Sequence, residues 1–187
     1  MIGAGAWGTA LGQAAAIAGR RVTIVGRDPA VIGAINRMHH NPKHLGTLQL
    51  SERVVAATEL PEADLVILAV PAQASRAALT GLADRLTGKP VVLTAKGLEA
   101  KTLKRQSEVL AEMAPSAIAY VLSGPSFADD VAAGRPTAVT LAGDDPPSAR
   151  TCARNASAPV ETATDFISLL MNASFRRLSA SKPDGDR

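Results

Sequence analysis

The sequence of 187 residues predicts an α/β fold with a doubly wound parallel sheet. Short apolar runs of four to seven residues alternate along the chain with segments of helical spacing. Four of the five runs lack a clean polar alternation, which is typical of parallel strands buried on both faces. With 47% apolar and 20% charged residues, the composition is that of a globular chain with one compact core.

The expected elements follow one another in turn. Strands bounded by glycine, proline or charge are expected at 21–25, 64–70, 90–94, 118–122 and 137–141. Helices are expected at 6–18, 29–38, 72–86, 98–113 and 127–133. After residue 143 the chain becomes rich in Ser, Thr, Ala and Asn, with one short apolar helix expected at 166–171. We therefore divide the chain into a domain at 1–143 and a divergent, short C-terminal tail at 144–187.

Composition and charge exclude several classes of protein. The net charge is +3 and the isoelectric point near 9.4, but Lys and Arg are scattered and aromatic residues make up only 3%, which argues against a nucleic-acid partner. Cys152 is the single cysteine, so we expect a reducing, cytoplasmic setting without an internal disulfide. Residues 1–19 carry no charge, yet their glycines argue against a membrane span or export signal. No metal-ligand cluster is visible.

The sequence Gly3-Ala-Gly5-Ala-Trp-Gly8 leads directly into the first expected helix. In this spacing one glycine permits a tight turn, one lets backbone N–H groups approach a pyrophosphate, and the third allows close helix packing. The helix N-terminus adds partial positive charge. The loop therefore predicts that 1–143 is a dinucleotide-binding domain of the Rossmann type.

The end of the strand at 21–25 is where the adenosine ribose of a dinucleotide would lie. Asp28, twenty positions after Gly8, would favour a free 2′-hydroxyl, whereas Arg27 could pair with a 2′-phosphate, so NAD and NADP both remain open. We expect Asp28 to cap the helix that begins at Pro29, and Arg27 to face the ribose.

Only Met1 and Ile2 precede Gly3. The strand that feeds such a loop should hold about five or six residues and lie in the middle of the sheet. We therefore expect a truncated first strand, through a misassigned start or a real truncation.

Several segments together resemble bacterial NAD(P)-dependent glycerol-3-phosphate dehydrogenase, in order and at the family's spacing over residues 2 to about 142. They are Gly3-Ala-Gly-Ala-Trp-Gly-Thr-Ala10, Gly26-Arg-Asp-Pro29, Asn41-Pro-Lys-His-Leu45, Val70-Pro-Ala-Gln73, Ala95-Lys-Gly-Leu-Glu99, Ser123-Gly-Pro-Ser-Phe-Ala128 and Gly134-Arg-Pro-Thr-Ala-Val-Thr-Leu-Ala142. The resemblance implies reduction of dihydroxyacetone phosphate to sn-glycerol 3-phosphate for glycerophospholipid synthesis, with NAD or NADP as cofactor. It also leaves a homodimer open for the full-length family.

The resemblance assigns roles to individual residues. Cofactor contacts would come from Gly3, Gly5, Ala6, Trp7, Gly8, Arg27, His44, Lys96 and Ala128. The substrate would be held by Lys96, Gly124 and Ser126. These roles make chemical sense because an ammonium, a hydroxyl and helix N–H groups suit a phosphate or a carbonyl oxygen. The alternatives are core packing for Trp7, a solvated surface charge for Lys96 and a helix cap for Ser126.

The family's proton donor is a lysine of its second, helical domain, in a segment resembling Gly-Ala-x-Lys-Asn. Nothing between residues 143 and 187 matches it, and Lys182 lies in an expected loop. We therefore expect no catalytic residue in this chain, which would make its own activity doubtful. The alternative functions are a non-catalytic NAD(P)-binding remnant and a related ketone-reducing dehydrogenase, such as a ketopantoate or sugar-acid enzyme.

Overall fold

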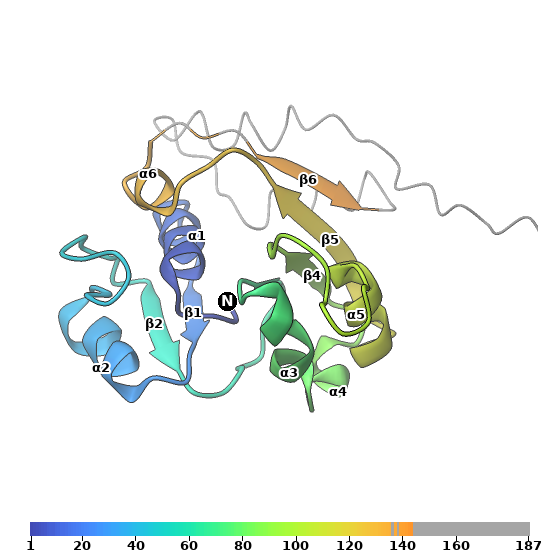
Figure 1. The fold of residues 1–187 in the computed structure, drawn as a ribbon. Coiled ribbons are helices and arrows are strands. Elements are labelled where there is room, and N and C mark those ends of the chain that lie inside the picture. The colour runs from blue at the N-terminus through green and yellow to red at the C-terminus, as the bar shows by residue number, and fades with distance from the viewer. Residues whose placement is uncertain (136, 138, 144–187) are drawn as a thin grey trace, which may run out of the picture.

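The computed structural model describes residues 1–135, 137 and 139–143, which form the expected mixed α/β fold (Figure 1). In chain order the elements are α1 (Ala6–Ile17), β1 (Val22–Val25), α2 (Pro29–Met38), β2 (Val54–Ala57), β3 (Val66–Leu68), the 3-10 helix η1 (Ala72–Ala74), α3 (Ser75–Leu79), α4 (Ala83–Leu86), β4 (Pro90–Leu93), α5 (Gln106–Met113), β5 (Ile118–Ser123), α6 (Ala128–Ala132) and β6 (Thr140–Gly143). None of the helices in this part of the chain is long and apolar enough to cross a membrane. The helix expected at 166–171 lies outside the described residues.

The first residues of the chain lie in the middle of the sheet, as expected. The strand order is β2-β1-Ile2-β3-β4-β5-β6, because Ile2 pairs in parallel with both β1 and β3. The Ile2 N–H donates to the Ile67 carbonyl, and the Ile2 carbonyl accepts from Ala69, both at 2.8 Å. Figure 1 shows the N-terminus between the β1–β2 pair and the other strands.

The sheet is parallel from β2 to β5, as expected, whereas β6 at its edge runs antiparallel to β5. The pair Ser123 and Thr140 shows why, since the connection leaves β5 and enters β6 at the same end of the sheet. Its helix, α6, has only five residues and does not carry the chain back to the other end, as a parallel crossover would require.

Helices cover the sheet in two layers. On one face α1, α2 and α6 pack against buried strand residues, and on the other face α3 and α5 do so. Successive side chains of the central strands point to opposite layers: Ile67 and Val92 contact the first cluster, whereas Leu68 and Leu93 contact the second. Burial on both faces is the reason for their continuous apolar sequences.

Three other elements differ from the sequence prediction. The helix expected at 72–86 is broken at Gly81, whose φ of 74° is not helical. The helix expected at 98–113 starts only at Gln106, where the Glu108 carboxylate accepts the N–H of Arg105 at 2.8 Å. The strand β2, which pairs with the outer edge of β1, was not expected.

Candidate cofactor site at the sheet's carboxyl edge

The N-terminus of α1 has no side-chain cap. Gly5 is the N-cap residue in extended backbone, and the first turn holds no acidic residue. Helical bonding begins with the Thr9 N–H, which donates to the Gly5 carbonyl at 2.9 Å. The N–H groups of Ala6, Trp7 and Gly8 therefore have no helical acceptor, and no side chain of the described residues replaces it. This helix start offers three donors and a positive dipole end to an anion.

The loop glycines serve different geometric purposes. Gly3 has φ +115°, and a Cβ there would lie 2.4 Å from the carbonyl oxygen of Ala69. A Cβ at Gly8 would lie 2.1 Å from the Gly3 oxygen, so Gly8 permits close packing of α1 on the loop. A Cβ at Gly5 would meet nothing within 4 Å. Gly5 alone of these three borders open space at the helix N-terminus, and the loop there fits a phosphate.

Asn41, which no sequence argument assigned to the site, ties two loops together. Its side chain is fully buried and its amide nitrogen donates to the Ala4 carbonyl at 3.0 Å and to Thr9 Oγ1 at 2.9 Å. The main-chain carbonyl of Asn41 accepts the N–H groups of His44 and Leu45. The turn that carries His44 is therefore fixed to the glycine loop. The sequence signals were the place of Asn41 in a segment that resembles the family and an asparagine before proline, and neither predicts a contact with the glycine loop.

At the end of β1 the Asp28 carboxylate is already engaged. One oxygen accepts the Ala30 N–H at 3.0 Å, which confirms the expected helix cap, and the other accepts from Lys43 Nζ at 2.8 Å. The hydrogen bond from Lys43 is the main cause of a lowered pKa for Asp28. Arg27 is exposed and makes no hydrogen bond or ion pair with other described residues. At the end of β1, the Arg27 guanidinium is therefore available to bind a ligand, whereas the Asp28 carboxylate already has two donors.

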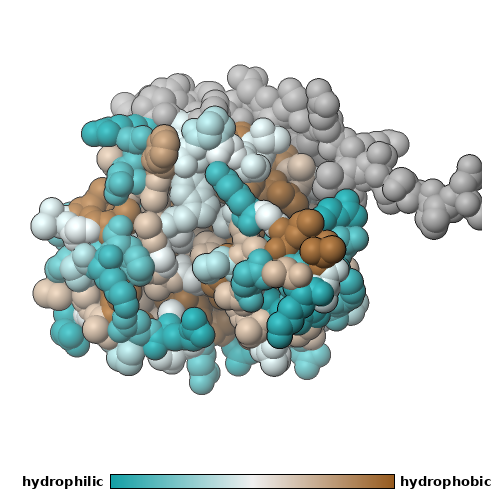
Figure 2. Space-filling model, in the orientation of Figure 1, coloured by the Kyte–Doolittle hydropathy of each residue, from teal (hydrophilic) through white to brown (hydrophobic). Residues whose placement is uncertain are grey.

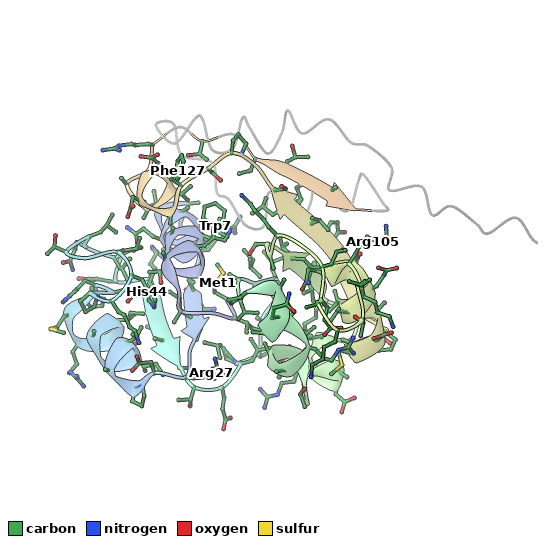
Figure 3. The ribbon with its side chains drawn as sticks, viewed as in Figure 1. Met1, Trp7, Arg27, His44, Arg105 and Phe127 are labelled. Atoms are coloured by element: carbon green, nitrogen blue, oxygen red, sulfur yellow. The ribbon has the colours of Figure 1, made fainter. Side chains whose placement is uncertain are left out.

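Trp7 lies in the first turn of α1, and His44 lies in the turn that Asn41 joins to the glycine loop. Trp7 is half-buried and packs in part against the α1–α6 cluster, so packing and a ligand contact are both open to it. His44 is exposed. Figure 3 shows Trp7 near Phe127 at the start of α6, with His44 and Arg27 on the side of the molecule that holds α2 and β2.

Lys96 follows β4 and is exposed on a long loop. The loop is fastened by Glu99, whose carboxylate accepts from Arg76 at 2.8 and 2.9 Å and from Thr102 Oγ1 at 2.5 Å. Arg76 is the principal cause of a Glu99 pKa lowered to about 2. These contacts explain why the chain does not enter a helix at 98: its backbone is held as a loop until Arg105.

Gly124, Ser126 and Ala128 follow β5 and are half-buried. The alternative role of Ser126 as a helix cap is not observed, because the N-cap residue of α6 is Phe127 and no side chain caps it. Ser126 Oγ is therefore not committed to the helix. Phe127 is 75% exposed, the largest exposure among the large apolar side chains of the described residues.

Four of the predicted site residues come directly after, or within a few residues of, the carboxyl ends of parallel strands. Gly3 follows Ile2, Arg27 follows β1, Lys96 follows β4 and Gly124 follows β5. The strand order reverses its direction of growth at Ile2, and in open α/β sheets the crevice at such a point binds ligands. Figure 2 shows residues of intermediate hydropathy down the middle of this side, between more hydrophilic and more hydrophobic groups.

A family model described as the N-terminus of NAD-dependent glycerol-3-phosphate dehydrogenase matches residues 1–149. The chain belongs to this family. Family membership confirms the resemblance seen in the sequence motifs.

Curated relatives agree with the family match. The glycerol-3-phosphate dehydrogenase, NAD(P)+, of Parvibaculum lavamentivorans is 50% identical over 149 residues, which cover 78% of this chain and 45% of the relative. That of Caulobacter vibrioides is 45% identical over 174 residues, covering 89% and 53%. This member of the glycerol-3-phosphate dehydrogenase family thus spans about half the length of the curated relatives it matches.

Solved structures of the same family have the same fold. The glycerol-3-phosphate dehydrogenase of Coxiella burnetii superposes with a TM-score of 0.77 at 25% identity, over 84% of this chain and 50% of that one. The Plasmodium falciparum enzyme gives a TM-score of 0.75 at 24% identity, over 84% and 49%. Their similarity confirms the Rossmann-type architecture.

Proposed function

We propose that the chain supplies the cofactor-binding part of an NAD(P)-dependent glycerol-3-phosphate dehydrogenase. This enzyme would act in the cytoplasm on dihydroxyacetone phosphate and sn-glycerol 3-phosphate, a precursor of glycerophospholipids. The nicotinamide cofactor, when bound, supplies or accepts the hydride. The residues of this chain bind and orient the two ligands, and no described residue is assigned as the proton donor.

The observation that carries the proposal is the uncapped start of α1. The N–H groups of Ala6, Trp7 and Gly8 need an acceptor, Gly5 leaves space beside them, and a pyrophosphate would provide the oxygens. Gly3 and Gly8 contribute by allowing the loop and helix to pack closely. The fit depends on backbone groups, so it does not need a particular side chain at the loop.

Arg27, His44 and Ala128 would complete the cofactor site. Because Lys43 and the Ala30 N–H already hold Asp28, the local charge near the ribose is set by exposed Arg27. A guanidinium there favours a 2′-phosphate through a charge-assisted hydrogen bond. Arg27→Ala should therefore weaken binding of NADPH more than binding of NADH, and an unchanged preference would remove Arg27 from the site.

Lys96, Gly124 and Ser126 would hold the phosphorylated substrate. They offer an ammonium, a backbone N–H and an uncommitted hydroxyl, which are donors suited to an anion. Glycerol 3-phosphate should accordingly bind to the cofactor-loaded chain, whereas glycerol should not. Calorimetric titration of both compounds tests this part, and equal heats would contradict it.

The decisive experiment is a cofactor titration of Gly5→Val against the unchanged chain. Trp7 is the only tryptophan, so its fluorescence reports directly on the helix start. The added side chain would enter open space, so we expect an unchanged melting curve and at least a tenfold loss of NADPH and NADH affinity. Equal affinity in the folded variant would remove the phosphate-loop assignment.

A further inference from the structure

The backbone around Lys96 forms a short arch between two fixed points. On the upstream side, the N–H and Oγ1 of Thr94 both donate to the Leu68 carbonyl of β3, at 3.2 and 3.1 Å. On the downstream side, the Leu98 carbonyl accepts from Gln73 Nε2 at 2.8 Å. Only residues 95–97 lie between these anchors, with Lys96 in the centre.

Gln73 holds the downstream end of the arch with both ends of its amide. Besides its bond to Leu98, its Oε1 accepts the N–H of Ala100 at 2.8 Å. The side chain is exposed and belongs to η1, the turn that directly follows β3. The turn η1, which follows β3, is thus hydrogen-bonded to the loop that follows β4. Both lie at the sheet edge that carries the proposed site.

A second, deeper contact keeps the loop attached independently of Gln73. The Glu99 side chain is 11% exposed and is bound by Arg76 through two hydrogen bonds. Arg76 also reaches Glu112 of α5 at 2.7 Å. Loss of Gln73 would therefore free the arch at Leu98 and Ala100 without releasing the loop from the domain.

We propose that Gln73 is a positioning residue for Lys96. By fixing the Leu98–Ala100 backbone, it keeps the Lys96 ammonium at the carboxyl edge of the sheet, where cofactor and phosphorylated substrate meet. The inference rests on the proposed function, because it requires Lys96 to contact a bound ligand. A residue that acts only through Lys96 has no effect once Lys96 is removed, which a general structural role does not predict.

The test is a double-mutant cycle on the full chain, with NADPH affinity measured by Trp7 fluorescence. We expect Lys96→Ala to weaken binding about tenfold, the size of one lost charged hydrogen bond, and Gln73→Ala to weaken it about fivefold. The double variant should bind no more weakly than Lys96→Ala alone. Hydrogen exchange of the Ala100 amide should be faster in Gln73→Ala, while the melting temperature changes little.

Gln49→Ala is the matched control, since Gln49 is an exposed glutamine whose side chain makes no hydrogen bond among the described residues. It should leave affinity unchanged. Multiplicative losses in the double variant, or no effect of Gln73→Ala, would overturn the role of Gln73 alone. No effect of Lys96→Ala would overturn the Lys96 contact and this inference, while leaving the cofactor site intact. A folded chain that binds neither cofactor would overturn the proposed function as well.

Discussion

Ile2 divides the sheet into two halves, and the half with β1 and β2 is packed differently from the half that begins with β3 and β4. The strands β3 and β4 are buried on both faces, between α1 and α6 on one side and α3 and α5 on the other. In β1 and β2 only alternate residues are buried, and Val55 of β2 is 47% exposed. The β1–β2 side is thus covered by one full layer of helices, and the β3–β4 side by two.

This difference follows from the winding of the chain. Right-handed crossovers from Ile2 towards β2 place α1 and α2 on the same face, whereas growth in the other direction places α3 and α5 on the opposite face. The reversal occurs at Ile2, beside the glycine loop. The reversal that places the carboxyl ends of strands around the glycine loop therefore also leaves the β1–β2 side with a thinner core.

Gly8→Val should have the largest combined effect, on stability and on cofactor binding together, because it acts where the two sides meet. The new Cβ would lie 2.1 Å from the Gly3 carbonyl oxygen, and backbone cannot move aside as a flexible side chain can. We expect a loss of about 3 kcal/mol or more in the free energy of unfolding, and no cofactor binding. Urea unfolding and a cofactor titration measure both. Stability equal to that of Gly5→Val would contradict the close-packing role of Gly8.

Leu68→Ala and Ile24→Ala compare the two cores directly, since both side chains are almost fully buried. Leu68 on β3 lies within two helix layers, whereas β1, which carries Ile24, has one full layer to relax against the cavity. We expect about 4 kcal/mol for Leu68→Ala and about 2–3 kcal/mol for Ile24→Ala. Chemical denaturation of both variants checks the difference, and equal losses would mean that the thinner side is packed as rigidly as the other.

When the chain is produced with Met1 as its first residue, the amino group of Met1 gives the sheet centre a pH dependence of its own. It is buried and donates to the Thr23 carbonyl at 2.9 Å, and burial lowers its pKa from 8.0 to about 6. Between these values only the unfolded chain binds the proton, so stability should fall by about 3 kcal/mol as the pH falls from 8 to 6. Below pH 6 this contribution is constant. The slope should disappear in an amino-acetylated chain, and an unchanged slope would assign it to the histidines.

Glu99→Gln should have the smallest effect, a loss of stability that is present above pH 4.5 and disappears towards pH 2. The folded pKa of Glu99 is about 2, below the ordinary 4.5, because Arg76 stabilises the charged form. The stabilisation is present above pH 4.5 and is lost as the pH falls towards 2. We expect the variant to lose less stability than the unchanged chain between pH 4.5 and 2, as followed by circular dichroism. Identical acid unfolding curves would show that the Arg76 pair adds nothing.

Local signals in the sequence were sufficient for the elements that begin with a cap or a turn. The helix α2 has the bounds expected from Asp28 and Pro29, because a side-chain cap and a fixed proline φ act over only a few residues. The close-packed glycine loop before α1 was likewise readable from the glycine spacing. The expected helix at 98–113 failed, since the bonds from Gln73 and Arg76 that hold its first part as a loop come from about 25 residues earlier.

The sequence by itself determined the α/β alternation, the glycine loop and the family to which the chain belongs. Tertiary structure alone decided which groups at the site remain available. Lys43 forms an ion pair with Asp28, Asn41 hydrogen-bonds two loops together, and the Ser126 hydroxyl does not cap the helix that follows it. Tertiary structure also decided the direction of β6. The physical reason is that caps and periodicities are set by neighbours in sequence, whereas hydrogen-bond partners and strand pairing are chosen among groups that only the folded chain brings together.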